Sequence, residues 1–549
     1  MARSLSLLAL ACFTLLGCSQ SLEDPTAAMS ERSLAGHIRV LSSDAFEGRA
    51  PASRGEERTV AYLVERFAAL GLRPGNGSSW TQDVPLVGIS TAPGAALEVA
   101  GGATGLRFVN GLEAVLFSKR VAPRATLDAS EMVFVGYGVT APEAGWDDFK
   151  SLDLRGKTLV VLVNDPDFAS LEPGAFGGKR MTYYGRWTYK FEEAARRGAA
   201  GVLLVHDDAP AGYDWAVVTG SWTGEQFDLA TPDGNAGRAA VEGWLRRDAA
   251  LQLFAAAGQD LVALEQAAQS KDFRPVALGL RASVTLENTV RTQPSRNVIA
   301  LLPGAGRADE YLVYLAHWDH LGVDPTLAGD QIFNGAVDNA SGTAGLLELA
   351  AAFGALDPRP ARSIVFLAVT AEESGLLGSQ HYASQPVFPL ARTVAAINMD
   401  SMNVDGPTHD VTVIGRGASE LEDLLEQAAG VQGRTLTDEP SPEKGYFYRS
   451  DHFNFAKRGV PVLYAEGGVD LVAGGPAAGR AASERYRRAA YHKPGDELHA
   501  DWDLSGALQD LQLYYAIGHT LATSESWPNW RAGNEFRAAR DASRAAASE

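Results

Sequence analysis

The stretch SIVFLAVTAEESGLLGSQ, Ser363 to Gln380, begins as an apolar run and then places two carboxylates side by side. The run SIVFLAV predicts a buried β-strand, because apolar residues follow one another without a polar alternation. Glu372 and Glu373 come three residues after this strand. A stable core gains nothing from adjacent carboxylates at such a place, so the doublet indicates a function at the end of the strand.

Other apolar runs flank this one and alternate with helical patterns. Strands are predicted for RNVIALLPG from Arg296, EYLVYLAH up to His317, TVAAINMD up to Asp400, and VPVLYAEGG from Val460. A helix is predicted for SGTAGLLELAAAFGAL, which begins at Ser341. Alternating strands and helices predict an α/β fold with a mostly parallel, mixed sheet between helices on both of its faces.

Potential ligands follow several of these strands. In open α/β sheets, ligands bind outside the carboxyl ends of the strands. Two further candidates come from NGAVDNASG, ahead of a helix N-terminus, and from YHKPGDE. The candidates are His317, Asp319, Asp338, Glu372, Glu373, Asp400 and His492. Each of them alone is more often a structural residue, but carboxylates gathered at one sheet edge repel one another unless a cation neutralises them.

The composition of this set favours a pair of metal ions. Imidazoles with carboxylates suit Zn²⁺, and other divalent ions such as Mn²⁺ or Co²⁺ are possible. Five of the candidates would be ligands: His317, Asp338, Glu373, Asp400 and His492. Five exceed what one catalytic zinc takes, but they fit two ions that share a carboxylate. Two such ions about 3.5–4 Å apart can hold a hydroxide and polarise a carbonyl. One member of the doublet would then bind metal, and its neighbour would accept and return a proton.

The N-terminus predicts export. The chain has 549 residues and a formal net charge of −19, so it has no electrostatic reason to bind nucleic acid. Residues 1–17 read as a signal peptide, and LLGC resembles the bacterial lipobox in which Cys18 receives lipid. Residues 18–28 would be a lipid-anchored spacer. We therefore expect an exported bacterial lipoprotein of the outer membrane, periplasm or cell surface. Cys12 and Cys18 are the only cysteines, so the mature body has no disulfide and no Cys ligand.

The motifs identify a family resemblance. HWDHLG at His317, NGAVDNASGTAGLLELA, AEESGLLGS, INMDSM, SDHFNF and YHKPGDE occur in the order found in the co-catalytic di-zinc aminopeptidases related to bacterial leucyl aminopeptidase and glutamate carboxypeptidase II. LSSDAFEGR, residues 41–49, resembles the N-terminal segment of that family. The chain is similar to this family over about residues 295–523.

The resemblance implies a role for each candidate. His317 and Asp400 would bind one zinc, Glu373 and His492 the other, and Asp338 would bridge them. Glu372 would be the general base, and Asp319 would orient the His317 imidazole. Tyr491 would offer a hydroxyl to the oxyanion. The role of His452, in SDHFNF, stays open.

The resemblance also divides the chain. Residues 29–128 would be the N-terminal part of the peptidase domain and 287–525 its main part, followed by a C-terminal tail, 526–549. Residues 129–286 resemble a β-rich protease-associated domain, a class thought to cover the active-site entrance. The stretch 469–490 is expected to be a loop beside the substrate cleft. Its arginines would either bind a substrate carboxylate or keep the loop solvated.

The implied activity is that of an aminopeptidase acting on peptides with a free N-terminus, with Glu372 activating the hydroxide. A carboxypeptidase of the same fold is the nearest alternative. A glutaminyl cyclase, which shares the fold and uses one zinc for acyl transfer, is another. A receptor-like relative without catalysis is the least favoured, because every expected ligand is present. The oligomeric state and the side-chain preference are not predicted.

Overall fold

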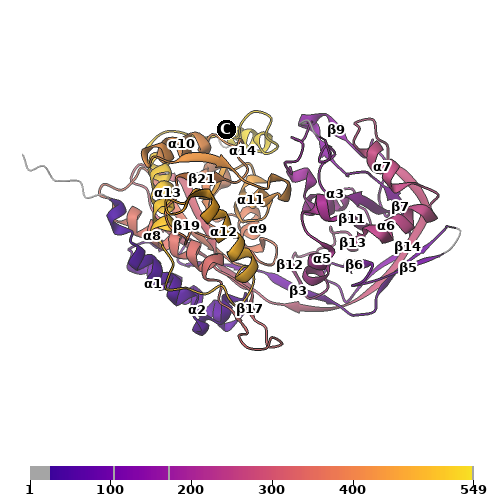
Figure 1. Cartoon of the computed structure of the whole chain (residues 1–549), viewed down its shortest axis with the longest axis horizontal. Coiled ribbons are helices and arrows are strands. Elements are labelled where there is room, and N and C mark those ends of the chain that lie inside the picture. Colours follow the sequence, from indigo (N-terminus) through magenta and orange to yellow (C-terminus); the bar gives the residue numbers. More distant parts are fainter. Residues whose placement is uncertain (1–24, 103–104, 171–173, 547–549) are drawn as a thin grey trace, which may run out of the picture.

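Two β-sheets organise the chain, one in each of two lobes that lie side by side (Figure 1). The computed structural model describes residues 25–102, 105–170 and 174–546. The first lobe contains residues 25–84 and 295–546, and the second lobe contains residues 86–292. The second lobe is therefore inserted into the first. The predicted signal peptide and Cys18 lie outside the described residues.

The first sheet has nine strands in the order β1-β15-β19-β16-β20-β23-β21-β22, with β2 also paired to β15. Its centre, from β19 to β23, is parallel, while β15 runs antiparallel to β19. The mixed, mostly parallel sheet expected from the sequence is confirmed. The strands are β1 (Arg73–Pro74), β2 (Thr81–Val84), β15 (Ser295–Leu302), β16 (Arg307–His317), β19 (Arg362–Val369), β20 (Thr393–Asn398), β21 (Asp410–Val413), β22 (Thr435–Asp438) and β23 (Val462–Gly467).

Helices cover both faces of this sheet, because successive side chains of its central strands enter opposite cores. In β19, Ile364 and Phe366 join the larger core and Val365 and Leu367 join the smaller one. The larger core packs under α1 (Glu31–Leu41), α2 (Arg54–Ala69), α8 (Gly342–Gly354), α10 (Leu421–Val431) and α13 (Ser505–Thr523). The smaller core packs under α9 (Leu377–Ser384) and α11 (His452–Ala456), with α14 (Arg537–Ala546) nearby.

Local sequence signals set the ends of the early helices. The Ser53 side chain accepts a hydrogen bond from the Glu56 backbone N–H and so caps α2. Gly71, just past the helix, has a φ of 77°, which favours glycine. Local sequence therefore fixes both ends of α2.

The second lobe is built on a ten-stranded sheet with its own core. Its centre, β7-β10-β11-β13, is parallel. The strands are β3 (Leu86–Thr91), β4 (Ala96–Ala100), β5 (Leu106–Val109), β6 (Ala114–Phe117), β7 (Arg124–Phe134), β10 (Thr158–Leu162), β11 (Gly201–His206), β12 (Gln226–Leu229), β13 (Val241–Arg246) and β14 (Val276–Thr292). The helices are α3 (Trp187–Arg196), α4 (Asp208–Ala211), α5 (Trp215–Trp222), α6 (Arg247–Ala256) and α7 (Leu261–Ala268).

The boundary expected at residue 129 falls inside this second sheet. Strands β3 and β4 lie before that residue, yet both pair with β14, which extends past residue 286. Pairing between strands almost two hundred residues apart leaves no signal in local periodicity, so the sequence alone could not assign β3 to β6 to this lobe.

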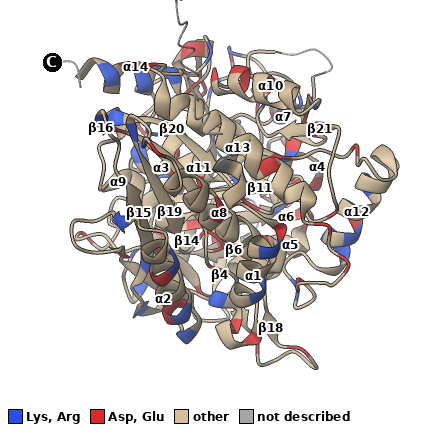
Figure 2. Cartoon of the chain, turned by 90° about the vertical axis from the view of Figure 1, so that its left-hand side faces the viewer, with Lys and Arg blue, Asp and Glu red and all other residues tan. Residues whose placement is uncertain are grey.

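Residues 475–489 differ from the expected loop, because they form α12 (Gly475–Ala489). Its alanines favour a helix, and Pro476 stands in the first turn, where proline is tolerated. Figure 2 shows basic residues on α12 and α14, with acidic and basic residues mixed elsewhere. Among the described residues, no helix is both long enough and apolar enough to cross a membrane.

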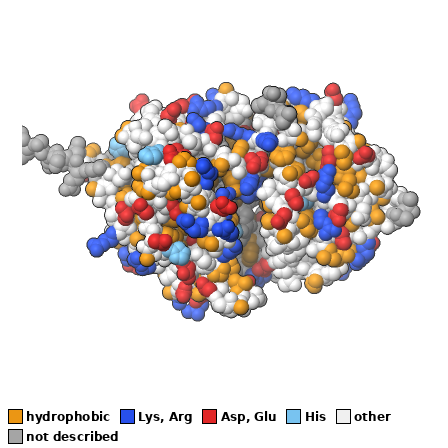
Figure 3. Space-filling view, viewed as in Figure 1, with side chains coloured by type: hydrophobic (Ala, Val, Ile, Leu, Met, Phe, Trp, Pro, Cys, Tyr) orange, Lys and Arg blue, Asp and Glu red, His pale blue; other side chains and the backbone are white. Residues whose placement is uncertain are grey.

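The two lobes meet through aromatic, polar and apolar contacts. Tyr183 of the second lobe lies 5.1 Å from Phe453 between ring centroids, and Lys457 Nζ lies 3.3 Å from Glu192 Oε1. A small apolar cluster includes Leu86 of β3 and Ala371, next to the glutamate doublet. The boundary is visible as a furrow in the space-filling view (Figure 3). The second lobe thus contacts both the loop that follows β19 and helix α11 of the first lobe.

Candidate metal centre

Three strand ends bring candidate ligands to one edge of the first sheet. The neighbours β19, β16 and β20 are parallel, and His317 stands opposite Val369 at the ends of β16 and β19. Glu373 follows β19 by four residues, and Asp400 follows β20 by two. Parallel strands end at the same edge, so local chain order is enough to gather these side chains.

Asp338 lies between two imidazoles. Its Oδ1 is 3.3 Å from His317 Nε2, and its Oδ2 is 3.2 Å from His492 Nε2. The same imidazoles also face the outer carboxylates, with His317 Nε2 3.3 Å from Asp400 Oδ1 and His492 Nε2 3.2 Å from Glu373 Oε2. The predicted ligands therefore form two groups of three that share Asp338, one oxygen to each group.

The spacing within each group fits a metal ion. Two ligands of a tetrahedral zinc, each about 2.0–2.2 Å from it, lie about 3.4 Å apart. The four nitrogen-to-oxygen distances of 3.2–3.3 Å match that value. His317 and Asp338 are buried, while His492 keeps 37% of its side chain exposed. Ions could thus be held firmly and still be reached from solvent on the His492 side.

The charges of these groups fit metal binding. Burial works against charge on His317, but Asp400 and Glu372 outweigh it and raise the pKa of His317 well above its ordinary value. Burial and Asp338 oppose charge on Glu373, but His492 and His320 lower the pKa of this carboxyl to about 2. Without ions, protonated imidazoles would balance the carboxylates. Divalent ions can replace those protons, because metal ligands bind in their deprotonated forms.

Glu372 lies beside this group without belonging to either triad. Burial, together with Asp400 and Glu373, raises the pKa of Glu372 well above its ordinary value, although His317 opposes the shift. A carboxyl next to two others is hard to ionise until cations offset their charge. Bound ions would therefore restore an ionised Glu372 that can accept a proton.

Asp319 holds the glutamate loop rather than the imidazole. Its carboxylate accepts hydrogen bonds from the backbone N–H groups of Glu372, at 3.1 Å, and Glu373, at 3.4 Å. The Nδ1 atom of His317 lies 3.1 Å from the backbone oxygen of Asp319 and 3.8 Å from its carboxylate. The imidazole is thus oriented by the Asp319 backbone, and the side chain positions the doublet.

Arg49 connects the two ligand-bearing loops, a role that the sequence did not indicate. Its buried guanidinium donates hydrogen bonds to the backbone oxygens of Leu41, Trp318, Asn334 and Gly335 at 2.6–2.9 Å. Trp318 follows His317, and Gly335 precedes the turn with Asp338. The segment LSSDAFEGR therefore contributes a cross-link beneath the site. The arginine in this segment is the sequence feature that could have indicated the cross-link.

Two further side chains orient the ligands. Ser450 Oγ donates to Asp400 Oδ2 at 2.7 Å, so Oδ1 remains toward His317. Asp496 accepts hydrogen bonds from the backbone N–H groups of Val337 and Asp338 at 3.0 and 3.1 Å. Both residues belong to motifs that the sequence analysis singled out, SDHFNF and YHKPGDE, but their partners were not predictable from spacing.

The remaining predicted residues lie at the edge of the site or beneath it. Tyr491 stacks on His492 with ring centroids 3.9 Å apart and is 45% exposed. Loss of solvent contact together with Asp338 raises the pKa of its phenol above the usual range. His452 is buried between Phe447 and Tyr464, and burial lowers its pKa to about 3. His452 is thus a core residue.

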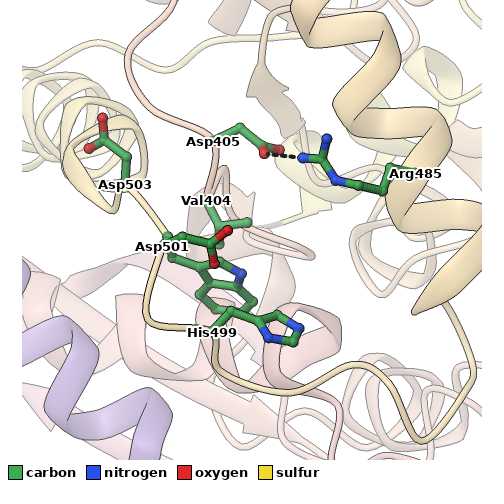
Figure 4. A pocket seen from close by; sticks show the side chains of 7 residues that line it. Val404, Asp405, Arg485, His499, Asp501 and Asp503 are labelled. Carbon is green, nitrogen blue, oxygen red and sulfur yellow. Dashed lines mark hydrogen bonds and ion pairs between the residues drawn. The ribbon is translucent and has the colours of Figure 1, made fainter.

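A cavity of about 360 Å³ lies next to α12 (Figure 4). Arg485 of α12 projects into it and pairs with Asp405 at 3.2 Å. The cavity is lined by Val404, Asp405, Arg485, His499, Asp501, Trp502 and Asp503, and none of these is a candidate metal ligand. An arginine already paired with an aspartate supports the structural interpretation of this helix over recognition of a substrate carboxylate.

Comparison with known proteins assigns the region that holds the site. Residues 297–516 match Peptidase family M28. The matched segment includes all five candidate metal ligands. Over 127 residues, 22% of the chain, it is 37% identical to mouse "Aminopeptidase NAALADL1", of which it covers 16%. Over 140 residues, 25% of the chain, it is 34% identical to a Caenorhabditis briggsae "Glutamate carboxypeptidase 2 homolog", of which it covers 17%.

Further M28-like proteins include a "Probable zinc metalloprotease" of Pyrenophora tritici-repentis, 32% identical over 157 residues, which are 27% of this chain and 35% of that protein. The chain therefore spans about a third or less of these relatives. Among solved structures, an aminopeptidase from Aneurinibacillus sp. strain AM-1 superposes with a TM-score of 0.50 and 19% identity over 92% of this chain and 97% of that one. This likeness confirms the α/β fold expected from the alternation of strands and helices.

Proposed function

We propose that the protein is a zinc-dependent aminopeptidase that removes residues from the free N-terminus of peptides. The observation that carries the proposal is the pair of ligand triads sharing Asp338, with Glu372 beside them. His317 and Asp400 would hold one ion, and Glu373 and His492 the other. Bound there, two zinc ions would polarise the scissile carbonyl and lower the pKa of a water molecule.

Glu372 would carry the proton through the reaction. Its carboxylate accepts the proton of the attacking water as the carbon–oxygen bond forms. It then delivers that proton to the amide nitrogen as the carbon–nitrogen bond breaks, so the leaving amine departs neutral. Asp319 supports this role because it fixes the backbone N–H of Glu372.

Two features would orient the substrate. Tyr491 stacks on His492, and its hydroxyl would donate a hydrogen bond to the oxygen that becomes negative. The carboxylates that line the site would attract the positively charged N-terminal amine of a peptide. This charge preference, with the name of the mouse relative, favours an aminopeptidase, and the name of the Caenorhabditis briggsae relative keeps a carboxypeptidase as the alternative.

A substrate panel tests the activity on the full exported chain. Aminoacyl fluorogenic substrates, with and without an N-acetyl group, are assayed with and without chelator on protein of measured zinc content. We expect cleavage of free but not blocked substrates, loss of activity with chelator, and about two zinc ions per chain. Cleavage of blocked peptides at the C-terminus would instead indicate a carboxypeptidase. Full activity with one zinc and cyclisation of N-terminal glutamine would indicate a glutaminyl cyclase.

We also propose that the second lobe is a protease-associated domain that covers one side of the site. It packs against Ala371 beside the glutamate doublet and, through Tyr183, against Phe453 just after Ser450. A cover at this place would restrict access to short or extended peptides. A series of peptides of increasing length, which includes chains long enough to fold, tests this. The cleavage rate should fall once the substrate is folded. Equal rates on folded and unfolded chains would contradict the proposal.

The export proposal rests on the N-terminal sequence. Cys18 would be lipidated after removal of residues 1–17 and would anchor the protein to a bacterial membrane. Metabolic labelling with a fatty acid should mark the wild-type protein and leave a Cys18→Ala variant unlabelled. Equal labelling, or none, would remove the anchor from the proposal.

A further inference from the structure

His320 lies beside the second triad and has no role in the scheme above. Its side chain is completely buried, and its Nδ1 is 2.6 Å from Glu373 Oε1. The ring packs closely against Gly335, where an added Cβ would come within 2.6 Å of two ring atoms. Among the described residues, neither ring nitrogen nor Glu373 Oε1 has a hydrogen bond of good geometry, although Nδ1 and Oε1 are in close contact. The contact with Glu373 is therefore the polar contact that accounts for a buried imidazole here.

The distance argues against His320 as a ligand of the same ion as Glu373 Oε1. Two ligand atoms on one tetrahedral zinc lie about 3.4 Å apart. The other imidazole-to-carboxylate distances of the site, 3.2–3.3 Å, agree with that value, whereas 2.6 Å is the length of a short contact between a nitrogen and a carboxylate. His320 is thus a direct neighbour of a ligand.

The two oxygens of Glu373 face different imidazoles. Oε1 meets His320, and Oε2 lies 3.2 Å from His492 Nε2. A carboxylate is planar, so a contact that holds one oxygen also fixes the direction of the other. The ring of His320 is itself held by Gly335 and by its burial, so it can act as a stop for the carboxylate.

From this geometry we infer that His320 is a positioning residue that turns Glu373 Oε2 toward the second ion. The inference rests on the proposed two-ion function. It concerns only one ion, because the short contact of His320 is with Glu373, and the first triad contains His317, Asp338 and Asp400. Partners of this kind typically change metal affinity by about 10–100-fold when they are removed.

Zinc titration of the metal-depleted full-length protein tests the inference by calorimetry. Wild-type protein should bind two ions. His320→Phe keeps a ring but loses the nitrogen, so one of the two affinities should fall by about 10–100-fold while the other stays unchanged. His320→Asn places an amide N–H close to the position of Nδ1 and should recover most of the lost affinity.

His452→Phe is the matched control, because His452 is also completely buried in the first lobe and is surrounded by aromatic rings. It should bind both ions as the wild type does. Unchanged affinities in His320→Phe, equal weakening of both ions, or no recovery in a folded His320→Asn would overturn the inference alone. A wild-type protein that binds a single zinc would overturn the proposed two-ion function instead.

Discussion

Both lobes bury carboxylates, but they balance the charge in different ways. In the second lobe, Asp148 and Asp165 are buried near Lys190. Lys190 Nζ donates to the backbone oxygens of Tyr137 and Asn164 at 2.6 and 3.1 Å. Burial lowers the pKa of Lys190 to about 8, and it raises that of Asp165 to about 7. The cation of this cluster is a fixed part of the protein.

At the metal centre, a buried cation is also present, because the charge of Arg49 acts on Asp338 and Glu373, but histidines are the groups that pair with the carboxylates. Among the described residues, the ion pairs of Asp338, Glu373 and Asp400 are with histidines alone. Like Lys190, Arg49 donates its hydrogen bonds to backbone oxygens, so the histidines make the direct contacts with the carboxylates. The comparison teaches that buried negative charge indicates a ligand site where imidazoles that can exchange a proton for a metal ion face it, and a structural site where a lysine faces it.

The largest expected effect separates the two glutamates of the doublet. Glu372→Gln should lower kcat by about 10³-fold, because general acid–base catalysis contributes about 10²–10⁴-fold. Its zinc content should stay near that of the wild type. Glu373→Gln should lose one zinc as well as activity. Rates on an aminoacyl fluorogenic substrate and zinc analysis by mass spectrometry provide the measurement, and equal metal loss in both variants would refute the assigned roles.

The second lobe should respond to loss of its own cation. Lys190→Met removes the buried cation that faces both Asp148 and Asp165 and should lower the free energy of unfolding by about 3 kcal/mol, with zinc content unchanged. Lys157→Met is the control, since Lys157 pairs with Glu131 in a partly exposed contact worth less than about 1 kcal/mol. Urea unfolding measures both. If the two variants were equally stable, the Lys190 cluster would not be a structural counterpart of the metal centre.

Metal removal should affect one lobe only. Zinc at a hundred times its Kd stabilises the folded state by about 2.7 kcal/mol. Chelation should therefore speed hydrogen exchange in residues 336–341 and 371–377, while β10 and β11 of the second lobe keep their protection. Exchange measured by mass spectrometry checks this. Faster exchange in both lobes would mean that the ions stabilise the whole molecule.

The smallest effect concerns pH. The pKa of Asp165 is raised to about 7 by burial, although Lys190 opposes the shift. Between about pH 4 and pH 7 the folded state keeps a proton that the unfolded state has lost, so stability falls as the pH rises through this range. Asp165→Asn removes that proton and should lose about 2 kcal/mol less stability than the wild type between pH 5 and pH 7.

Hydrogen exchange of β10 at the two pH values, corrected for the intrinsic rate, measures this difference. The Thr182 backbone N–H donates to Asp165 Oδ2 and the Thr182 hydroxyl to Oδ1, each at 2.7 Å. In asparagine the amide oxygen can accept from the N–H, and the hydroxyl can turn to accept from the amide NH2. The variant should therefore fold normally. The same pH dependence in both proteins would assign the loss to other groups, such as Asp148.

Much of the candidate site was predictable because its ligands follow strands. His317 and Asp400 stand at or just after the ends of β16 and β20, and parallel strands bring such positions together. His320 lies in the HWDHLG motif that begins with His317, but the sequence did not indicate a role for it. A motif does not show which imidazole nitrogen contacts which carboxylate. The sequence also did not place β3 in the second sheet, because its partner β14 is distant in the chain.

The sequence by itself determined the alternation of strands and helices, the edge at which the carboxylates meet, and the need for cations there. These properties depend on the order of residues along the chain and on charge. Only the tertiary structure decided that Arg49 cross-links the ligand loops, that Asp319 holds the doublet through its backbone, and that the two oxygens of Glu373 are divided between His320 and His492. Such contacts depend on distances of a few ångströms between residues far apart in the chain, which local sequence does not encode.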